Sequence, residues 1–115
     1  MEPADTAKDL LSRGDAARRE RRMEEARKAF AAASEYYDRH GPAEMRIHAL
    51  MRRAQIERDT RNYDQAIGFQ KEALQLLRDS DGSGLAHALR HLADILHDAG
   101  RDSEAARYYT EMMSR

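Results

Sequence analysis

The chain has 115 residues and no cysteine, and its 20 basic and 21 acidic side chains leave a net charge of −1. The length suits one domain, and a chain without cysteine has no disulfides, thiolate chemistry or cysteine-bound zinc. The balanced charge provides no general attraction to nucleic acid or to membrane surfaces, so we expect neither as a partner. Valine is missing and Ala, Leu, Glu and Arg dominate, which favours helices over strands.

The beginning of the chain and its hydropathy suggest where the protein is found. The first residues, MEPADTAKD, are polar and acidic, unlike a secretory signal. No apolar stretch approaches the roughly 20 residues that a transmembrane helix needs. We therefore expect a cytoplasmic protein.

Helical periodicity dominates the first half of the chain. The first two predicted helices run over about residues 5–21 and 23–39. Gly41 and Pro42 then interrupt the pattern, because Gly suits the end of a helix and Pro the first position of the next. A third helix follows and ends near Thr60.

The second half of the chain carries its own start and stop signals. Asn62 is a good N-cap for the fourth helix, and Gln65 stands at capping-box spacing from it. This helix ends before the turn-rich sequence SDGSG. We expect Ser83 to cap the fifth helix, Gly100 to close it and Asp102 to cap the sixth.

Three sets of residues recur in register, at offsets of 40 and 39 residues. Each set has a leucine, a small residue four positions on and an alanine twelve positions beyond that. The sets are Leu10-Gly14-Ala26, Leu50-Ala54-Ala66 and Leu89-Ala93-Ala105. Because one helix pair cannot bury its apolar stripe alone, stacked pairs are expected. The prediction is an all-α solenoid of three antiparallel helix pairs, six helices in one domain, with repeats at about 5–41, 42–82 and 83–115.

This pattern resembles the tetratricopeptide repeat family. The aromatic residue that the family places four positions after the last small one is present as Phe30 and Tyr109, with Gln70 in its place in the second repeat. The repeats are longer than the family's 34 residues, which is similar to the long-repeat variety of kinesin light chains. The resemblance implies a non-catalytic scaffold that binds a peptide or a partner domain in a concave groove lined by the first helix of each repeat.

Mapping the family pattern position by position gives the expected groove residues. They are Lys8, Asp15, Arg19, His48, Arg52, Gln55, Arg58, His87, Arg90, His91, Asp94 and Asp98. The surface is mixed in charge, mildly positive and rich in histidine. We therefore expect a protein or peptide partner, with an acidic segment as its favoured feature.

Histidines and carboxylates on the fifth helix raise the question of a metal. His87, His91 and Asp94 fall at i, i+4 and i+7 on one helical face, and two histidines with a carboxylate can hold Zn²⁺. The HExxH order is absent, and the groove-facing positions hold four of the five histidines in any case. We expect local polar contacts here and no metal or cofactor. No phosphate-cradling or nucleophile motif is present either, so we expect no enzyme.

The end of the sequence suggests an alternative function. Many arrays of this family finish with an extra polar helix, whereas this sequence ends just after Tyr108, Tyr109, Met112 and Met113. We expect these four side chains to be exposed, and exposed Tyr and Met are common in contact surfaces. The alternative is therefore a self-assembly module, a homodimer formed through the last helix.

Overall fold

A computed structural model describes residues 3–115, apart from the side chain of Ala4. Over these residues the chain forms six α-helices and no strand, which confirms the all-α prediction. The helices are α1 (Pro3–Arg19), α2 (Met23–His40), α3 (Ala43–Asp59), α4 (Tyr63–Arg78), α5 (Leu85–Asp98) and α6 (Asp102–Met113). None of them is long and apolar enough to cross a membrane.

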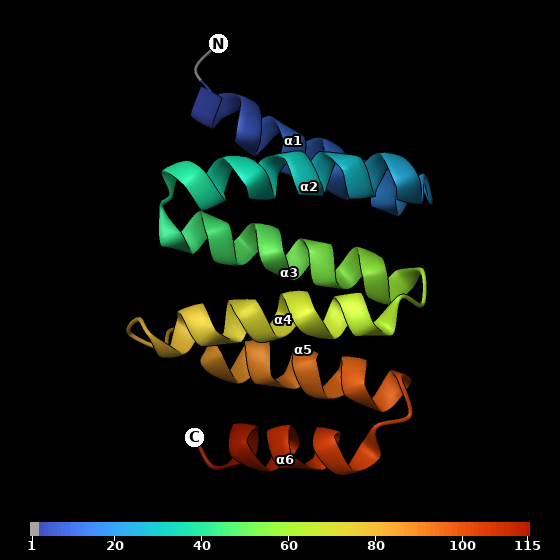
Figure 1. The fold of residues 1–115 in the computed structure, drawn as a ribbon, viewed down its shortest axis with the longest axis vertical. Helices are drawn as coiled ribbons and strands as arrows, with labels where there is room; N and C mark the ends of the chain where they lie inside the picture. Colours follow the sequence, from blue (N-terminus) through green and yellow to red (C-terminus); the bar gives the residue numbers. More distant parts are fainter. Residues whose placement is uncertain (1–2) are drawn as a thin grey trace.

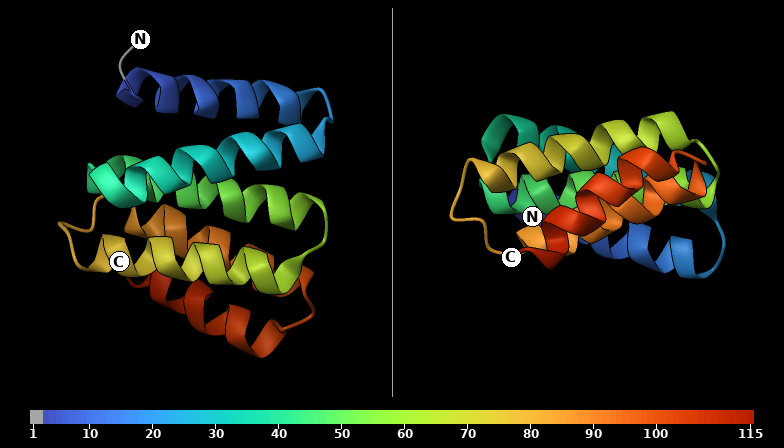
Figure 2. Two further views of the ribbon diagram at one scale, coloured as in Figure 1. Left: turned by 45° about the horizontal axis from the view of Figure 1, so that its top comes forward. Right: turned by 90° about the horizontal axis from the view of Figure 1, so that it is seen from below.

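The helices stack in chain order along the longest dimension of the molecule, as Figure 1 shows. Each helix packs against the one that follows it in the sequence, and Figure 2 shows the same stack from two further sides. The body measures 45 × 32 × 18 Å. A solenoid is expected to look like this, because each helix pair contacts only its neighbours.

The recurring alanines lie buried between the helices of each pair. Ala26, Ala66 and Ala105 are at most 2% exposed. In the first pair the approach is closest at Gly14, where an added Cβ would lie 2.4 Å from Cε1 of Phe30. The ring of Phe30 therefore occupies the space that a side chain at position 14 would need.

The second repeat replaces this aromatic residue with a polar one. Gln70 is 1% exposed, and its Nε2 donates a hydrogen bond to the backbone oxygen of Ala88, at 3.1 Å. Buried amide groups need such partners, since an unpaired one costs about 1–3 kcal/mol. Gln70 therefore ties α4 to α5, across the boundary between the second and third repeats.

A buried carboxylate joins α2, α3 and the turn before α4. Glu57 is 7% exposed and accepts hydrogen bonds from Nε and Nη2 of Arg27, at 2.9 and 3.0 Å. Nδ2 of Asn62 donates to the same carboxylate at 2.9 Å. Arg27 also donates to Oγ1 of Thr60. Paired in this way, the charge of Glu57 is tolerated in the interior.

The three turns inside the helix pairs share one backbone conformation. Arg21, Arg61 and Gly100 each have a positive φ, between 64° and 79°. The residue after each of them donates its N–H to a carbonyl five positions back, as Arg101 does to Leu96 at 2.8 Å. This is the Schellman ending of a helix. The predicted role of Gly100 is confirmed, although Ala99 is the C-cap residue itself.

Two predicted N-caps are wrong by one residue. Gly84, not Ser83, precedes the first turn of α5, with φ 82°. The N–H of Ser83 instead donates to the carboxylate of Asp81, which shapes the preceding loop. Asp102 is the first residue of α6 rather than its cap, because the carbonyl of Arg101 accepts the first helical hydrogen bond.

The cap predicted at Asn62 has the right position but no capping side chain. Asn62 precedes α4, and its carbonyl accepts the N–H of Ala66 at 3.0 Å. Its side-chain amide makes no capping bond, because it points to the carboxylate of Glu57. A tertiary contact has replaced the local one.

Candidate partner-binding groove

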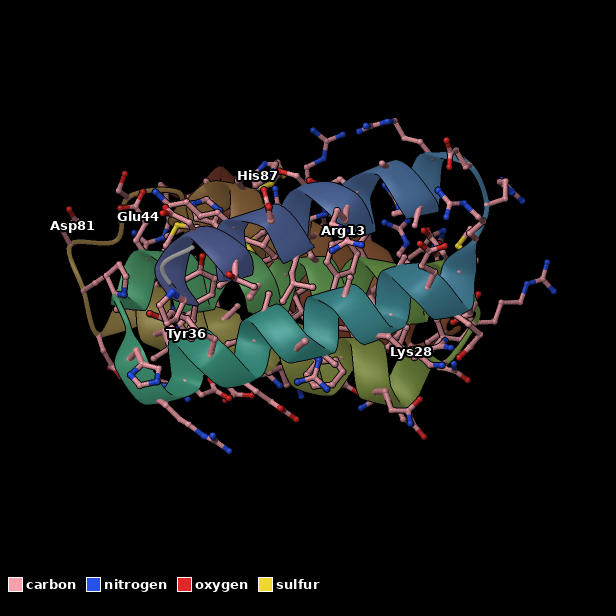
Figure 3. All side chains as sticks on the ribbon, turned by 90° about the horizontal axis from the view of Figure 1, so that it is seen from above. Arg13, Lys28, Tyr36, Glu44, Asp81 and His87 are labelled. Atoms are coloured by element: carbon pink, nitrogen blue, oxygen red, sulfur yellow. The ribbon has the colours of Figure 1, made fainter. Side chains whose placement is uncertain are left out.

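An open cavity of about 840 Å³ lies between α3 and α5 and extends along both helices, from Ala43 to Arg58 on α3 and from His87 to Ile95 on α5. Ile47, Met51, Leu77 and Ile95 provide its apolar lining. The loop between α4 and α5 forms part of the rim. Figure 3 shows Glu44 and Asp81 at the end of the molecule where α3 begins, and Lys28 on the opposite side, on α2.

Seven of the twelve residues expected in the groove line this cavity. They are Asp15, His48, Arg52, Gln55, Arg58, His87 and His91. The other five, Lys8, Arg19, Arg90, Asp94 and Asp98, do not. Arg19 lines a second cavity of about 320 Å³ at the end of α1, beside Arg21 and Met23.

Ion pairs join the first helices of successive repeats. The pairs are Arg18–Asp59, Arg52–Asp15 and Arg58–Asp98. Arg52 holds Asp15 of α1 at 3.0 Å, and Arg58 holds Asp98 of α5 at 2.6 Å. These side chains are about one-third exposed, so the pairs set the shape of the groove more than they stabilise the fold. An anionic ligand would have to compete with an aspartate for either arginine.

The charges that line the cavity correct the expectation of a mildly positive groove. Among the lining residues, the carboxylates are Asp15, Glu44 and Asp81, and the guanidinium groups are Arg52 and Arg58. With neutral histidines the lining therefore carries a charge of −1. The mapping missed Glu44 and Asp81 because it took residues only from the inner turns of the first helices.

The histidines divide into separate groups. The Nε2 atoms of His87 and His91 lie 3.1 Å apart, and the two rings meet edge to face. Burial is the main cause that lowers the pKa of His91, and the neighbouring His87 adds to it. His97 lies away from this pair, with its Nδ1 2.8 Å from a carboxylate oxygen of Asp102.

Asp94 and Asp98 are engaged elsewhere and do not join these histidines. The hydroxyl of Tyr109 donates to Asp94, and this bond is the main cause that raises the tyrosine pKa. Asp98 accepts from Arg58. The stripe of two histidines and two aspartates suggested by the spacing therefore does not form one cluster. In the described part of the chain, no group of three or more His, Cys, Asp or Glu residues is placed to hold a metal.

The fold and the sequence match a known family. The model of the tetratricopeptide repeat matches residues 45–114, more than half of the chain. The chain belongs to the tetratricopeptide repeat family. Among solved structures, the tetratricopeptide repeat domain of Arabidopsis FLU matches with a TM-score of 0.88 and 21% sequence identity, over 96% of this chain and 94% of that one. At this identity the likeness shows the fold. No curated protein matches the chain.

The last helix of this tetratricopeptide repeat domain is less exposed than expected. Tyr108, Tyr109 and Met112 are partly buried and pack against the core, and only Met113 is largely exposed, at 77%. A bidentate ion pair from Arg78 to Glu111, with N–O distances of 2.6 and 2.7 Å, fixes α6 on α4. The expectation of four exposed side chains was wrong, because α5 offers Tyr109 a hydrogen-bond partner and the core takes up the other two.

The sequence pattern did not predict most of the apolar lining of the cavity. Ile47, Leu77 and Ile95 belong to three different helices, and no one helix pattern marks them as neighbours. One signal was available, the extra residues between repeats. The loop at residues 80–84 is such an insertion, and four of its five residues line the cavity.

Proposed function

We propose that this domain is a non-catalytic scaffold that binds a peptide, or an extended segment of a partner protein, in the cavity between α3 and α5. The family and the fold are those of protein-interaction scaffolds. The observation that carries the finer proposal is the cavity itself, which is open to solvent and lies on the face formed by the first helices. We also propose that the protein is located in the cytoplasm.

The composition of the cavity suits a short peptide segment. Its volume of about 840 Å³ lies within the range of about 300–1,000 Å³ that is usual for binding sites. An apolar side chain of the ligand would rest on Ile47, Met51 and Ile95. Gln55, half-buried on α3, offers donors and acceptors to the peptide backbone.

A preference for an acidic segment stays a prediction. Lys8 and Arg19 lie outside the cavity but would favour an acidic segment that extends along α1, because both are exposed and no described carboxylate forms an ion pair with them. The carboxylates of Glu44 and Asp81 at the rim oppose it. Selection from a random peptide library would show the preference directly, as enrichment of acidic, basic or apolar residues.

The experiment is to select peptides on the wild-type domain and to measure their affinity by calorimetry for two variants. Met51→Glu places a charge on the cavity lining and should weaken binding at least about tenfold, the effect of burying an unpaired charge. Lys28→Glu changes charge on the opposite face and should leave the affinity unchanged. Equal affinities for both variants, or a selection that yields no binder, would contradict the proposal.

A second candidate function is self-assembly through α6. The observation that favours it is the exposed side chain of Met113, although this is a smaller patch than the sequence suggested. Sedimentation over a wide range of concentrations tests it. A dimer that Met113→Glu converts to monomer would support assembly, and a wild-type monomer at every concentration would exclude it.

A further inference from the structure

The imidazoles of His87 and His91 contact each other through their Nε2 atoms on the lining of the groove. They lie on successive turns of α5, with ring centroids 4.4 Å apart and ring planes at 76°. Their Nε2 atoms are closer than the centroids, at 3.1 Å. Both nitrogens therefore point toward the same region. Figure 3 shows His87 on the side of α1, away from the outer face of α2.

This separation is compatible with two histidines bound to a single metal ion. Zinc binds imidazole nitrogen at about 2.0–2.1 Å. An ion at about 2.05 Å from two atoms 3.1 Å apart makes an angle of about 98° between them. That value lies between the right angle of octahedral and the wider angle of tetrahedral coordination. Without a metal, the same geometry is a hydrogen bond between the two rings.

The surroundings leave room for the remaining ligands. Both histidines line the open cavity, so water or a carboxylate of a bound partner can reach the ion. The charges of Arg58 and Arg90 act on His91, and each of these arginines has a carboxylate beside it, Asp98 at 2.6 Å from Arg58 and Asp94 at 4.0 Å from Arg90. Their repulsion of a metal ion is therefore partly cancelled.

We propose that His87 and His91 form an open two-histidine site for a divalent transition metal that prefers imidazole, such as Zn²⁺ or Ni²⁺. The protein supplies two ligands, and solvent or a partner supplies the rest. This differs from the site considered from the spacing, because its third member, Asp94, is bonded to Tyr109. An open site of this kind binds more weakly than the closed four-ligand sites that hold structural zinc.

Titration calorimetry of tag-free protein with Zn²⁺ and with Ni²⁺ tests the site. We expect one ion per chain with micromolar affinity, and no response to Mg²⁺, which prefers oxygen ligands. His87→Ala and His91→Ala should each weaken binding at least about tenfold. His97→Ala is the matched control, since His97 lies on the same helix but bonds to Asp102, and it should bind as the wild type does.

Thermal unfolding provides a second readout. A ligand that binds only the folded state stabilises it by an amount that grows with the logarithm of the ligand concentration once this exceeds Kd. Zn²⁺ should therefore raise the Tm of the wild type and of the His97→Ala variant, but not that of the other two. The proposal is overturned if millimolar Zn²⁺ and Ni²⁺ fail to bind, or if single removal of His87 or His91 leaves the affinity unchanged. Peptide binding is measured without metal, so failure here leaves the proposed function standing.

Discussion

Gly14 and Phe30 form a matched pair that the other repeats do not share. The Cβ of an alanine at position 14 would lie 2.4 Å from Cε1 of Phe30. Gly14→Ala should therefore force the ring or the helix to move, at a cost of about 1–3 kcal/mol in the free energy of unfolding. Urea denaturation measures this cost.

Gly68 is the control for that substitution. It is also a helical glycine, but it lies in α4 with open space around it. Gly68→Ala should stabilise the protein by about 0.5–1 kcal/mol, because alanine loses less backbone entropy on folding. If both substitutions changed the free energy of unfolding in the same direction, helix propensity and not the ring of Phe30 would decide the effect.

Glu57 gives the stability a dependence on pH. Burial alone would raise its pKa, but hydrogen bonds from Arg27 and Asn62 outweigh this effect, so the pKa lies below its ordinary value. A carboxyl group whose pKa is lowered by folding stabilises the native state above the pKa of the unfolded chain, about 4.3. That contribution disappears as the pH falls through the folded value.

Glu57→Gln should therefore cost about 1–3 kcal/mol at pH 7 and progressively less below about pH 4. Urea denaturation of both proteins at several pH values measures the difference. Glu35→Gln, at an exposed position on α2, should show a difference near zero at every pH. A cost for Glu57→Gln that stays constant down to pH 3 would show that the carboxylate is not stabilised by these partners.

At the scale of elements, the turns inside the helix pairs contain residues with a left-handed backbone conformation, and its cost can be measured. Arg61 adopts φ 64°, and Gly100 adopts φ 79° at the equivalent place. Left-handed backbone is unfavourable for residues with a Cβ, by about 1 kcal/mol. Arg61→Gly should therefore stabilise the protein by up to about 1 kcal/mol, and Gly100→Ala should destabilise it by a similar amount. Thermal melts that show the reverse order would contradict the assigned turn conformation.

The helices themselves were predictable because their signals are local and repeated. The recurrent alanines, such as Ala66, placed all three helix pairs, and Gly100 marked its turn. The errors lie where a tertiary contact overrides a local preference. Asn62 bonds to Glu57 instead of capping its own helix. Arg21 and Arg61 also adopt left-handed conformations, which the arginine side chain does not predict.

At the scale of the whole molecule, the groove was only partly predictable. The family pattern placed residues such as Arg52 and His87 on the lining, because helical register decides which side faces inward. It could not show that Arg52 and Arg58 are already paired with aspartates on neighbouring helices. It also could not show the full apolar lining, because Leu77 belongs to α4, whereas the pattern takes groove residues from the first helix of each repeat.

The central claim, that partners bind in the cavity between α3 and α5, is tested most directly by mapping a selected peptide with amide chemical shifts. We expect the largest changes on the cavity-lining residues of α3 and α5, from Ala43 to Arg58 and from His87 to Ile95, and on residues 80–84. The helix α2 and the outer face of α4 should be unaffected. Changes centred on α6 and Met113, or on the outer face that carries Lys28, would contradict it.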